Sequence, residues 1–449
     1  MLQLMIAAPR SGSGKTMVTC ALLRALQKRG LDPCAFKCGP DYIDPMFHRA
    51  VLGVESRNLD LFLSDEACVR DLYAQGCRDH GAAVVEGAMG YYDGLGGTSD
   101  RTSAWHIADT LDIPVLLVVR AKGVSLTLAA EIRGLTKFRE NSHIAGVLLN
   151  ECPPKICETL LPVLERETGI PVLGCLPHME EAQIENRHLG LHTAGEIGGL
   201  SERLELLARK LEMNLDWTRF ERLFSREESF PKRKESIDSF RRIRVAIAND
   251  NSFCFTYRET LDTLRRFGAE LVPFSPLGDA DLPDEIGGLY LPGGYPELYA
   301  KALFDNRSMR ESIKKAIQSG LPTMAECGGF LYLGEVLCDE LGRGYPMTGA
   351  LPGHAANTGH LVRFGYQTLC AESDSLLFRK GERIPAHEFH YWDSTDCGDG
   401  LLAEKGTRRW RCGFVSDTIY AAFPHLYFAG KPRLAERFVE AARQYKENR

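Results

Sequence analysis

Short apolar runs alternate with longer amphipathic stretches over the first 200 residues of the chain. The apolar runs are predicted to be strands buried on both faces, at 2–8, 82–86, 114–119 and 144–150. Stretches with the helical spacing of apolar positions lie between strands, at 16–29 and 125–137. Because strands and helices alternate in this way, the pattern predicts an α/β domain with a parallel sheet and crossover helices.

The same alternation appears a second time after a charged segment. Residues 201–224 are predicted to be helical, and the segment 225–242 that follows is poor in apolar residues, as is typical of a linker. Further strands are then predicted at 244–248, 270–274, 288–291 and 322–325, with helices at 257–267 and 308–319. We therefore expect two α/β domains, residues 1–225 and 244–449, joined by a linker at 226–243.

A glycine-rich turn follows the first predicted strand and opens the first helix, which is the context that a P-loop requires. Its sequence is APRSGSGKT (8–16), with Pro9 at the position of the first glycine of the P-loop motif. Gly12 and Gly14 allow the backbone to curl, so that N–H groups of this turn, including that of Ser13, point at phosphate oxygens. This motif predicts a nucleotide site.

The P-loop motif assigns a role to each of the two residues at its end. Lys15 is expected to reach the β- and γ-phosphates of ATP, and the hydroxyl of Thr16 is expected to bind Mg²⁺. We also assign Asn150, at the end of the predicted strand 144–150, to the nucleotide site.

Acidic residues lie in two segments where a strand is expected to end in a Gly- or Pro-bearing loop, at the sheet edge where ligands of open parallel sheets bind. Asp41 and Asp44 lie in FKCGPDYIDP (36–45), and Glu86 and Asp93 lie in EGAMGYYDG (86–94). These carboxylates could converge on the phosphates through Mg²⁺, which prefers oxygen ligands. Spacing alone leaves an alternative open, in which the two aspartates are turn formers beside proline and Glu86 caps a helix.

A second candidate site lies in AECGG (325–329), directly after the predicted strand 322–325. Cys327 stands at the apex of a strand–turn–helix between small residues, which is typical of a nucleophile elbow. Its position at a helix N-terminus is expected to lower the pKa of the thiol. A buried structural cysteine is the alternative interpretation.

Two further features would complete a cysteine-nucleophile site. The backbone N–H groups of Gly293 and Gly294, after the predicted strand 288–291, could stabilise an oxyanion. His425, in AAFPHLYF (421–428), is the leading candidate for the base. Four other histidines compete with it and are interpreted as structural or substrate-facing: His354, His360, His387 and His390.

Composition narrows the class of protein. The chain of 449 residues is 44% hydrophobic and 25% charged, with a net charge of −6, so it offers no overall basic surface for nucleic acid. No apolar run reaches the ~20 residues that a membrane span needs, and residues 2–9 lack the preceding basic region of a secretory signal. We therefore expect a cytoplasmic protein that binds neither nucleic acid nor membrane.

Several motifs, in this order, resemble the cobyrinate a,c-diamide synthase family over nearly the whole chain. They are FKCGPDYIDPMFH (36–48), NLDLF (58–62), VVEGAMGYYDGLGG (84–97), ENRHLGL (185–191), LPGGYPEL (291–298), AECGG (325–329), HEFHY (387–391) and PHLYF (424–428). The resemblance implies a dethiobiotin-synthetase-like ATP domain followed by a class I glutamine amidotransferase domain. It also implies stepwise amidation of the a- and c-carboxylates of a cobalt corrinoid through acyl phosphates, with ammonia released from L-glutamine.

The resemblance also implies roles for single residues. Cys327 would be the nucleophile and His425 the base, while Asp93 would lie close to the acceptor. Tyr427 stands two residues after His425, where the wider amidotransferase class carries a glutamate, so what orients His425 stays open. The acids that would bind Mg²⁺ and phosphate are Asp41, Asp44 and Glu86.

Other substrates and other functions remain to be separated. The same chemistry on hydrogenobyrinate or nickel-sirohydrochlorin is the nearest alternative, because those enzymes share the same motifs. Cobyric acid synthase fits FKxGPDYIDP and HEFHY less well, and a ParA/MinD-type regulatory ATPase has no use for AECGG and a late histidine. The expected partners are small molecules, and a homodimer is one expectation for the oligomeric state.

Overall fold

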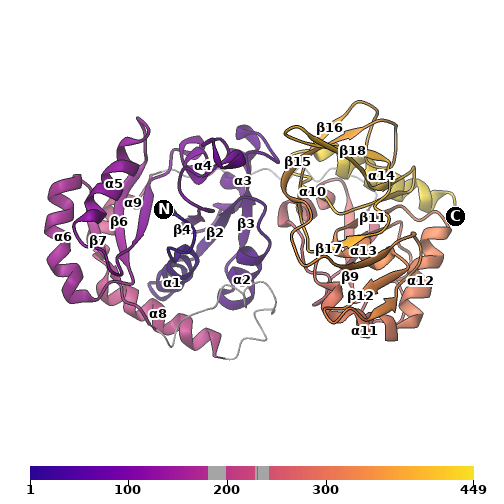
Figure 1. The fold of residues 1–449 in the computed structure, drawn as a ribbon, viewed down its shortest axis with the longest axis horizontal. Coiled ribbons are helices and arrows are strands. Elements are labelled where there is room, and N and C mark those ends of the chain that lie inside the picture. The colour runs from indigo at the N-terminus through magenta and orange to yellow at the C-terminus, as the bar shows by residue number, and fades with distance from the viewer. Residues whose placement is uncertain (180–198, 228–229, 231–241) are drawn as a thin grey trace. The chain divides into compact units, whose positions relative to one another are not determined.

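The computed structural model describes residues 1–179, 199–227, 230 and 242–449 (Figure 1). Internal contacts divide the chain into two compact units, Met1–Leu61 with Asp65–Glu235, and Phe62–Ser64 with Ser236–Arg449. Most of the predicted linker 226–243 and the motif ENRHLGL (185–191) lie outside the described residues. Each unit has its own sheet and its own hydrophobic core.

The first unit is built on a parallel sheet that, over the described residues, has seven strands in the order β3-β2-β4-β1-β5-β6-β7 (Figure 1). The strands are β1 (Leu2–Ala7), β2 (Pro33–Cys38), β3 (Ser56–Leu59), β4 (Ala82–Glu86), β5 (Val115–Arg120), β6 (Ile144–Asn150) and β7 (Val172–Leu176). The helices are α1 (Lys15–Lys28), α2 (Ile43–Leu52), α3 (Glu66–Gly76), α4 (Ala104–Leu111), α5 (Thr127–Lys137), α6 (Pro154–Thr168), α8 (Leu200–Asn214) and α9 (Trp217–Phe224), with a 3-10 turn η1 (Leu95–Gly97). The predicted α/β architecture is confirmed, and the strands predicted at 82–86 and 144–150 match β4 and β6 residue for residue.

The prediction that 201–224 is helical is wrong at the junction of α8 and α9. Leu215 is extended, with φ −100° and ψ 130°, and it forms an isolated β-bridge with Gly174. The side chain of Asp216 then caps α9 by accepting a hydrogen bond from the backbone N–H of Arg219 at 3.0 Å. A tertiary contact and a new cap therefore interrupt a stretch whose periodicity is continuous.

Packing beneath the sheet explains where the loops of the first unit lie. Leu4 and Ile6 of β1 and Val84 of β4 belong to one buried cluster with Leu22 of α1 and Leu207 of α8. Because the parallel strands are held side by side, the segments after β1, β2 and β4 all leave from the same edge of the sheet. That edge carries the P-loop and the predicted acidic residues.

The second unit has a six-stranded sheet within its described residues, in the order β20-β21-β11-β10-β8-β9. All neighbouring strands are parallel except β20 and β21. The strands are β8 (Ile243–Ala248), β9 (Ala269–Phe274), β10 (Gly288–Leu291), β11 (Thr323–Glu326), β20 (Phe414–Val415) and β21 (Ile419–Ala422). The helices are α10 (Arg258–Arg266), α11 (Ala300–Asp305), α12 (Arg307–Gln318), α13 (Gly328–Leu333) and α14 (Pro432–Glu447), with a 3-10 turn η3 (Pro296–Tyr299).

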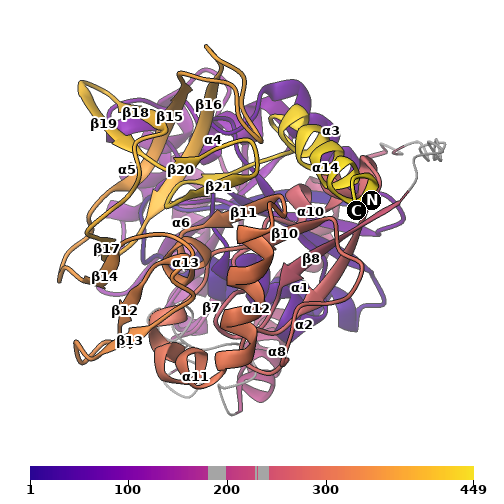
Figure 2. The ribbon, with the colours of Figure 1, turned by 90° about the vertical axis from the view of Figure 1, so that its right-hand side faces the viewer.

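Successive residues of these parallel strands face two different cores, as expected for strands buried on both sides. Tyr290 of β10 and Met324 of β11 pack in a cluster with Phe438 of α14. Leu291 and Ala325, the next residues along each strand, pack in a second cluster that includes residues of α11, α12 and α13. These three helices are labelled in Figure 2. This alternation decides on which side of β11 each of its side chains lies.

Between α13 and α14, the chain forms two further sheets, in which most neighbouring strands are antiparallel. One sheet has the order β13-β12-β14-β17, in which β12 and β14 are parallel, and the other has the order β19-β18-β15-β16-β22. Their bounds are β12 (Val336–Cys338), β13 (Gly344–Pro346), β14 (His354–Asn357), β15 (Phe364–Ala371), β16 (Arg383–Phe389), β17 (Trp392–Ser394), β18 (Leu401–Lys405), β19 (Arg408–Cys412) and β22 (His425–Leu426). In the described parts of both units, no helix is long and apolar enough to cross a membrane.

Candidate active sites

The P-loop turn joins β1 to α1 in the predicted place. Gly14 precedes α1 with φ 91° and ψ 22°, a left-handed conformation that favours glycine. A Cβ atom on Gly14 would lie 2.2 Å from Nδ2 of Asn150, so the turn has no room for a side chain. The same Nδ2 donates a hydrogen bond to the carbonyl oxygen of Ser13 at 2.9 Å. Asn150, at the end of β6, therefore braces the P-loop, while its predicted contact with nucleotide stays a prediction.

Next to the P-loop, the structure brings together the predicted acids around Lys37 of β2. The Nζ atom of Lys37 lies 2.9 Å from Oε1 of Glu86 and 3.9 Å from Oδ2 of Asp41, and it donates to Asp44. Oε1 of Glu86 also accepts a hydrogen bond from the hydroxyl of Thr16 at 2.6 Å. Thr16 and the three acids thus lie in one charged cluster, in which Asp44 and Glu86 are buried and Thr16 and Asp41 are half-buried.

Sequence reasoning missed two members of this cluster, Lys37 and His48. Lys37 is buried, and the Nε2 atom of His48 lies 3.6 Å from Oε2 of Glu86. The other ring nitrogen of His48 is 3.1 Å from the hydroxyl of Ser56. A signal for Lys37 was present, because it is a lysine within a short strand whose other residues are apolar. A buried lysine requires an anionic partner.

Burial and charge act against each other in this cluster. Burial favours neutral Glu86, but Lys37, His48 and Thr16 outweigh it and hold the pKa of Glu86 below its usual range. Burial lowers the pKa of Lys37, but the carboxylates of Asp44, Glu86 and Asp41 outweigh it and raise that pKa. For Asp44, burial and the neighbouring Glu86 raise the pKa despite Lys37. Fixed charges of both signs are therefore present before any ligand binds.

Lys15 differs from Lys37. Its Nζ atom donates to the carbonyl oxygen of Met89, and burial, followed by repulsion from Lys37, lowers its pKa to about 8. The carboxylate of Asp93 also accepts a hydrogen bond from the backbone N–H of Gly90 at 2.9 Å. The loop that holds Asp93 therefore lies beside the P-loop lysine.

The contacts of the acids bear on the alternative interpretation, in which the aspartates form turns and Glu86 caps a helix. Oδ1 of Asp41 accepts hydrogen bonds from the backbone N–H groups of Ile43 at 2.8 Å and of Asp44 at 3.3 Å, so Asp41 does form a turn. Glu86 instead ends β4 and bonds to side chains, so its interpretation as a helix cap is wrong. Within the described ranges, no three His, Cys, Asp or Glu side chains are grouped so that they could hold a metal by themselves. The adjacent oxygens of Thr16 and Glu86 nevertheless suit Mg²⁺, which completes its ligand shell with water and phosphate oxygens.

The strand–turn–helix around Cys327 is present in the second unit. Cys327 follows β11 directly and precedes α13, with φ 47° and ψ −105°. Positive φ is strained for a residue with a side chain, and such strain is found at nucleophile elbows. The turn thus gives Cys327 the backbone conformation of a nucleophile.

The expectation that the helix N-terminus lowers the pKa of this thiol is wrong. Burial raises the pKa of Cys327 above its ordinary range, and the carboxylates of Glu297 and Glu388 raise it further. The backbone N–H of Gly328 acts in the opposite direction and does not compensate. A helix of six residues, α13, cannot offset the loss of water around the thiol. The site therefore holds a neutral thiol, and its ionisation requires a base.

His425 lies where such a base is needed. A Cβ atom on Gly293 would lie 2.5 Å from Cε1 and 3.3 Å from Nε2 of His425, so this glycine makes room for the imidazole. The backbone nitrogen of Gly294, in turn, would be 3.0 Å from a Cβ atom on Gly328, the residue after Cys327. The turn at 293–294 thus touches both the imidazole and the elbow. The structure brings the four predicted residues of this site into one region.

Of the competing histidines, His390 has a structural environment. Its Nδ1 lies 2.5 Å from the carbonyl oxygen of Trp392, its Nε2 lies 2.7 Å from Oε1 of Glu388, and its ring stacks on Phe423 at 3.8 Å. His354 and His360 are exposed. His390 therefore has both ring nitrogens engaged with the protein.

His387 stands directly opposite His425 in the β16–β22 ladder. Burial, together with the positive charges that His425 and Lys405 can carry, lowers the pKa of His387 to about 3. His387 is therefore a neutral neighbour of the candidate base.

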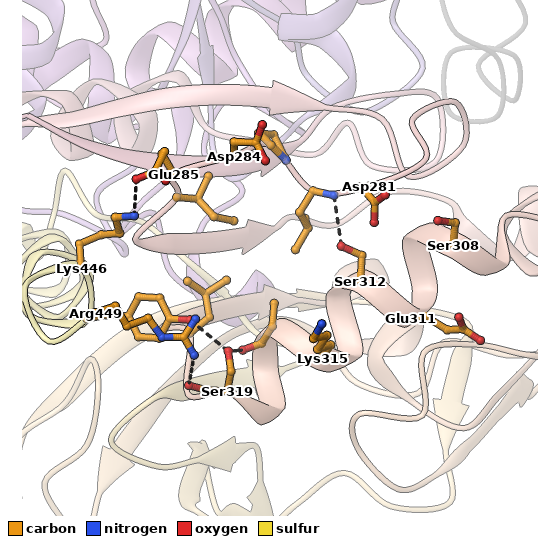
Figure 3. Close-up of a pocket in the computed structure, with 16 residues that line it drawn as sticks. Asp281, Asp284, Glu285, Ser308, Glu311, Ser312, Lys315, Ser319, Lys446 and Arg449 are labelled. Atoms are coloured by element: carbon orange, nitrogen blue, oxygen red, sulfur yellow. Dashed lines mark hydrogen bonds and ion pairs between the residues drawn. The ribbon is translucent and has the colours of Figure 1, made fainter.

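A pocket in the second unit lies away from this chemistry (Figure 3). It is lined by residues 281–286, by residues of α12 and by the C-terminal end of α14. Residues 281–286 precede β10, and Leu321, which also lines the pocket, precedes β11. Gly293 and Cys327 instead follow the carboxyl ends of these strands. The pocket thus lies at the opposite edge of the sheet and contains none of the candidate site residues.

Comparison with known proteins adds to this picture. Residues 4–191 match the family described as "CobQ/CobB/MinD/ParA nucleotide binding domain", and residues 244–433 match the "CobB/CobQ-like glutamine amidotransferase domain". Three relatives are each described as "Cobyrinate a,c-diamide synthase". That of Synechococcus sp. is 38% identical over 99% of both chains, and that of Caldanaerobacter subterraneus is 37% identical over 97% of both chains. That of Listeria innocua is 38% identical over 99% of this chain and 100% of its own.

Proposed function

The chain belongs to the cobyrinate a,c-diamide synthase family, and from this membership we propose that it amidates the a- and c-carboxylates of a cobyrinate-type corrinoid. The nitrogen comes from glutamine and the energy from ATP. One observation carries the proposal: this chain matches relatives described as cobyrinate a,c-diamide synthase over nearly the full length of both proteins. Each of the two matched domains also holds a candidate site.

The first site is suited to activating a carboxylate. A carboxylate oxygen of the corrinoid would attack the γ-phosphorus of ATP, the bond from that phosphorus to the β-phosphate oxygen would break, and ADP would leave. Lys15 and the N–H groups of the P-loop, at Gly12, Ser13 and Gly14, would hold the phosphates. Asp93, close to Lys15, would contact the acceptor. The product of this step is an acyl phosphate.

Magnesium fits the donor atoms of this site. Thr16 and Glu86 would bind it directly, with Asp41 and Asp44 beside them, and Lys37 would balance the remaining carboxylate charge. Bound Mg²⁺ would neutralise charge that develops on the phosphates. The donor set supports this assignment because all of its ligand atoms are oxygens.

The second site is suited to releasing ammonia. The sulfur of Cys327 would attack the carboxamide carbon of glutamine while His425 accepts the thiol proton. The N–H groups of Gly293 and Gly294 would stabilise the oxyanion, and His425 would return the proton to the departing ammonia. Water would then cleave the thioester to give glutamate. Ammonia would attack the acyl phosphate, phosphate would leave, and an amide would result.

Incubation with defined substrates tests this proposal. Purified protein would receive cobyrinate, hydrogenobyrinate or nickel-sirohydrochlorin, with ATP, Mg²⁺ and either glutamine or ammonium, and products would be followed by mass spectrometry. We expect two successive amidations of cobyrinate with either nitrogen source. Preferred amidation of another tetrapyrrole would correct the substrate, and ATP hydrolysis without any amidation would overturn the proposal.

The remote alternative of a regulatory ATPase has less support. The nucleotide-binding match includes MinD and ParA in its description, but an amidotransferase match covers residues 244–433. A positioning ATPase has no need for a cysteine at a strained turn beside a histidine.

A further inference from the structure

The carboxylate of Glu326, the residue before Cys327, is buried beside the candidate base. Glu326 and His425 have exposed fractions of 1% and 3%. Oε2 of Glu326 lies 3.5 Å from Nδ1 of His425 and accepts a hydrogen bond from the hydroxyl of Tyr290 at 2.9 Å. Oε1 accepts a hydrogen bond from the backbone N–H of Leu426 at 2.9 Å. The carboxylate is therefore held in place from two sides and faces the imidazole.

Alternation along β11 explains how two adjacent residues can act on one histidine. Met324 and Ala325 belong to the two different cores of the second unit. Glu326 therefore points to the side of Met324, where Tyr290 and Leu426 lie, whereas Cys327 packs with Ala325. The nucleophile and the acid thus leave the strand on opposite sides.

The two edges of the imidazole have different surroundings. Nδ1 faces Glu326, whereas the edge with Cε1 and Nε2 lies against Gly293, in the turn that also touches the elbow. A carboxylate at Nδ1 favours the tautomer with its proton on that nitrogen, which places the lone pair that accepts a proton on Nε2. Separations such as 3.5 Å are common in unliganded sites and shorten when substrate binds.

We propose that Glu326 positions His425 and stabilises its protonated form, so that Cys327, His425 and Glu326 act as a triad. This inference rests on the proposed roles of Cys327 and His425. The need for such a group is clear, because burial raises the pKa of the thiol and the proton must pass to the imidazole. The position two residues after His425 is occupied by Tyr427, which has no carboxylate and packs against Tyr257.

A purely structural role for Glu326 is the alternative to be separated. The carboxylate also ties β11 to Leu426 of β22, so its removal could disturb the site without any effect on proton transfer. Among the residues that the structure describes, Glu326 of β11 and His387 of β16 lie next to His425, and Tyr290 of β10 lies behind the carboxylate. Measurements that report on His425 itself distinguish the two roles.

The first variant is Glu326→Gln, which keeps the size of the side chain and an acceptor for the N–H of Leu426. We expect kcat/KM for glutamine hydrolysis to fall by up to about 10⁴, as in triads that lose their carboxylate. Amidation with ammonium should stay within about twofold, because the ATP site is untouched. The acidic limb of the pH profile should move to lower pH, since an imidazole without its anionic neighbour is a weaker base.

Tyr290→Phe is the matched control. It removes the hydrogen bond that the hydroxyl of Tyr290 donates to the same carboxylate oxygen and leaves the charge in place. We expect glutamine hydrolysis within about threefold of the parent and an unchanged pH profile, since one hydrogen bond to a retained carboxylate contributes about 1 kcal/mol or less. Equal losses in Tyr290→Phe and Glu326→Gln would overturn the proposal, because the effect would then follow the network and not the charge.

Alkylation of Cys327 by iodoacetamide completes the test, because it needs no glutamine. The rate would be measured in the parent, Glu326→Gln, His425→Ala and the double variant. If Glu326 acts through His425, its replacement slows alkylation in the parent and does not slow it further in His425→Ala, where the carboxylate would only raise the pKa of the thiol. The same slowing in both backgrounds, or none in the parent, would overturn the proposal.

Two further outcomes keep the test decisive. Should Glu326→Gln not fold, Glu326→Asp keeps the charge and should retain the parental pH profile, with a rate lower by about tenfold. A shifted profile in the aspartate variant contradicts the proposal. A separate result would show that the proposed function is wrong. If Cys327→Ala still hydrolyses glutamine, Cys327 is not the nucleophile of a glutaminase site. If Cys327→Ala is inactive while Glu326→Gln is fully active, only the triad is wrong.

Discussion

The two candidate sites are both buried, but they hold charge in opposite ways. Around the P-loop, the ammonium of Lys37 pairs with the carboxylate of Glu86 and also donates to Asp44, whose pKa is raised by burial and by Glu86. Around the elbow, the pKa of Cys327 is raised and that of His387 is lowered, so both side chains are neutral. The first site is arranged before its ligand arrives, whereas the second must create charge during each turnover.

This difference in charge follows from the ligand that each site would bind. A site for ATP and Mg²⁺ meets ligands that are already charged, so fixed protein charges of both signs orient them. A glutaminase site meets a neutral carboxamide, and its nucleophile becomes an anion only when a base accepts the proton. Substitutions should therefore have consequences of different kinds in the two units.

The largest expected effects come from removing one key residue in each site. Cys327→Ala should reduce glutamine-supported amidation by at least about 10³-fold and leave ammonium-supported amidation unchanged, because only the nitrogen source is lost. Both rates are measured by mass spectrometry of the corrinoid. If both nitrogen sources fail equally, Cys327 does not belong to a separate glutaminase site.

Lys15→Ala is the reciprocal change and should lower both activities by about 10²-fold or more, because carboxylate activation precedes either nitrogen source. Lys28→Ala, at the other end of α1, is the matched control and should leave both activities intact. Its ammonium contacts Glu205 and Glu212 and not the P-loop. Retained ammonium-dependent turnover in Lys15→Ala would contradict the ATP site.

A smaller effect is expected from Glu86→Gln. The substitution keeps the shape but removes one negative charge, so amidation should fall by about 10–100-fold and recover in part at high Mg²⁺. Glutamine hydrolysis at Cys327 should be unaffected. The measurements are the amidation rate against Mg²⁺ concentration and the melting temperature of each variant.

Asp65→Asn provides the comparison for Glu86→Gln, because Asp65 is a true helix cap that accepts a hydrogen bond from the N–H of Cys68 at 2.8 Å. It should alter stability by about 1 kcal/mol or less and leave turnover normal. The same pattern in Glu86→Gln, Asp41→Asn and Asp44→Asn would leave the metal site without support.

The lowered pKa of Lys15 predicts a pH dependence of ATP binding. Phosphate binds the ammonium form, which is already present below the pKa of about 8, so affinity should be constant there. Above that pKa a proton must be taken up on binding, and Kd should rise by up to about tenfold per pH unit. Calorimetry in buffers of different ionisation enthalpy would detect the proton, and Lys15→Arg should remove the dependence. A constant Kd up to pH 10 contradicts the lowered pKa.

The smallest effect concerns His387 and the stability of the second unit. Its pKa is about 3 in the folded protein and ordinarily 6.5, so between these values the unfolded chain binds a proton that the folded chain does not. Stability should therefore decrease as the pH falls below 6.5, by about 1–2 kcal/mol at pH 5. His387→Gln should show a smaller loss of melting temperature between pH 7.5 and 5 than the parent. The exposed His354→Gln is the control, and equal losses in all three proteins would contradict a buried neutral His387.

Much of the architecture followed from the sequence because it depends on neighbours along the chain. Apolar runs predicted β1, β4, β5 and β6 of the first sheet and β8 to β11 of the second, but not β2, β3, β7, β20 or β21. GSGKT and AECGG predicted the two turns that open α1 and α13. The strands β12 to β22 gave no comparable signal, because several have only two to five residues and many are half exposed. Their pairing is set by partners that are distant in the chain.

Tertiary structure alone decided the chemical state of the candidate sites. The sequence identified Cys327 and His425 as a pair, but the approach of Glu326 to Nδ1 depends on the pairing of β11 with β10 and on where β22 lies. Sequence reasoning did not single out Lys37, whose ammonium lies between three carboxylates. The pKa of the Cys327 thiol is raised and not lowered as expected, because burial and carboxylates from other segments act on it. Desolvation and charge act through space, and their balance is set only when segments far apart in the chain come together.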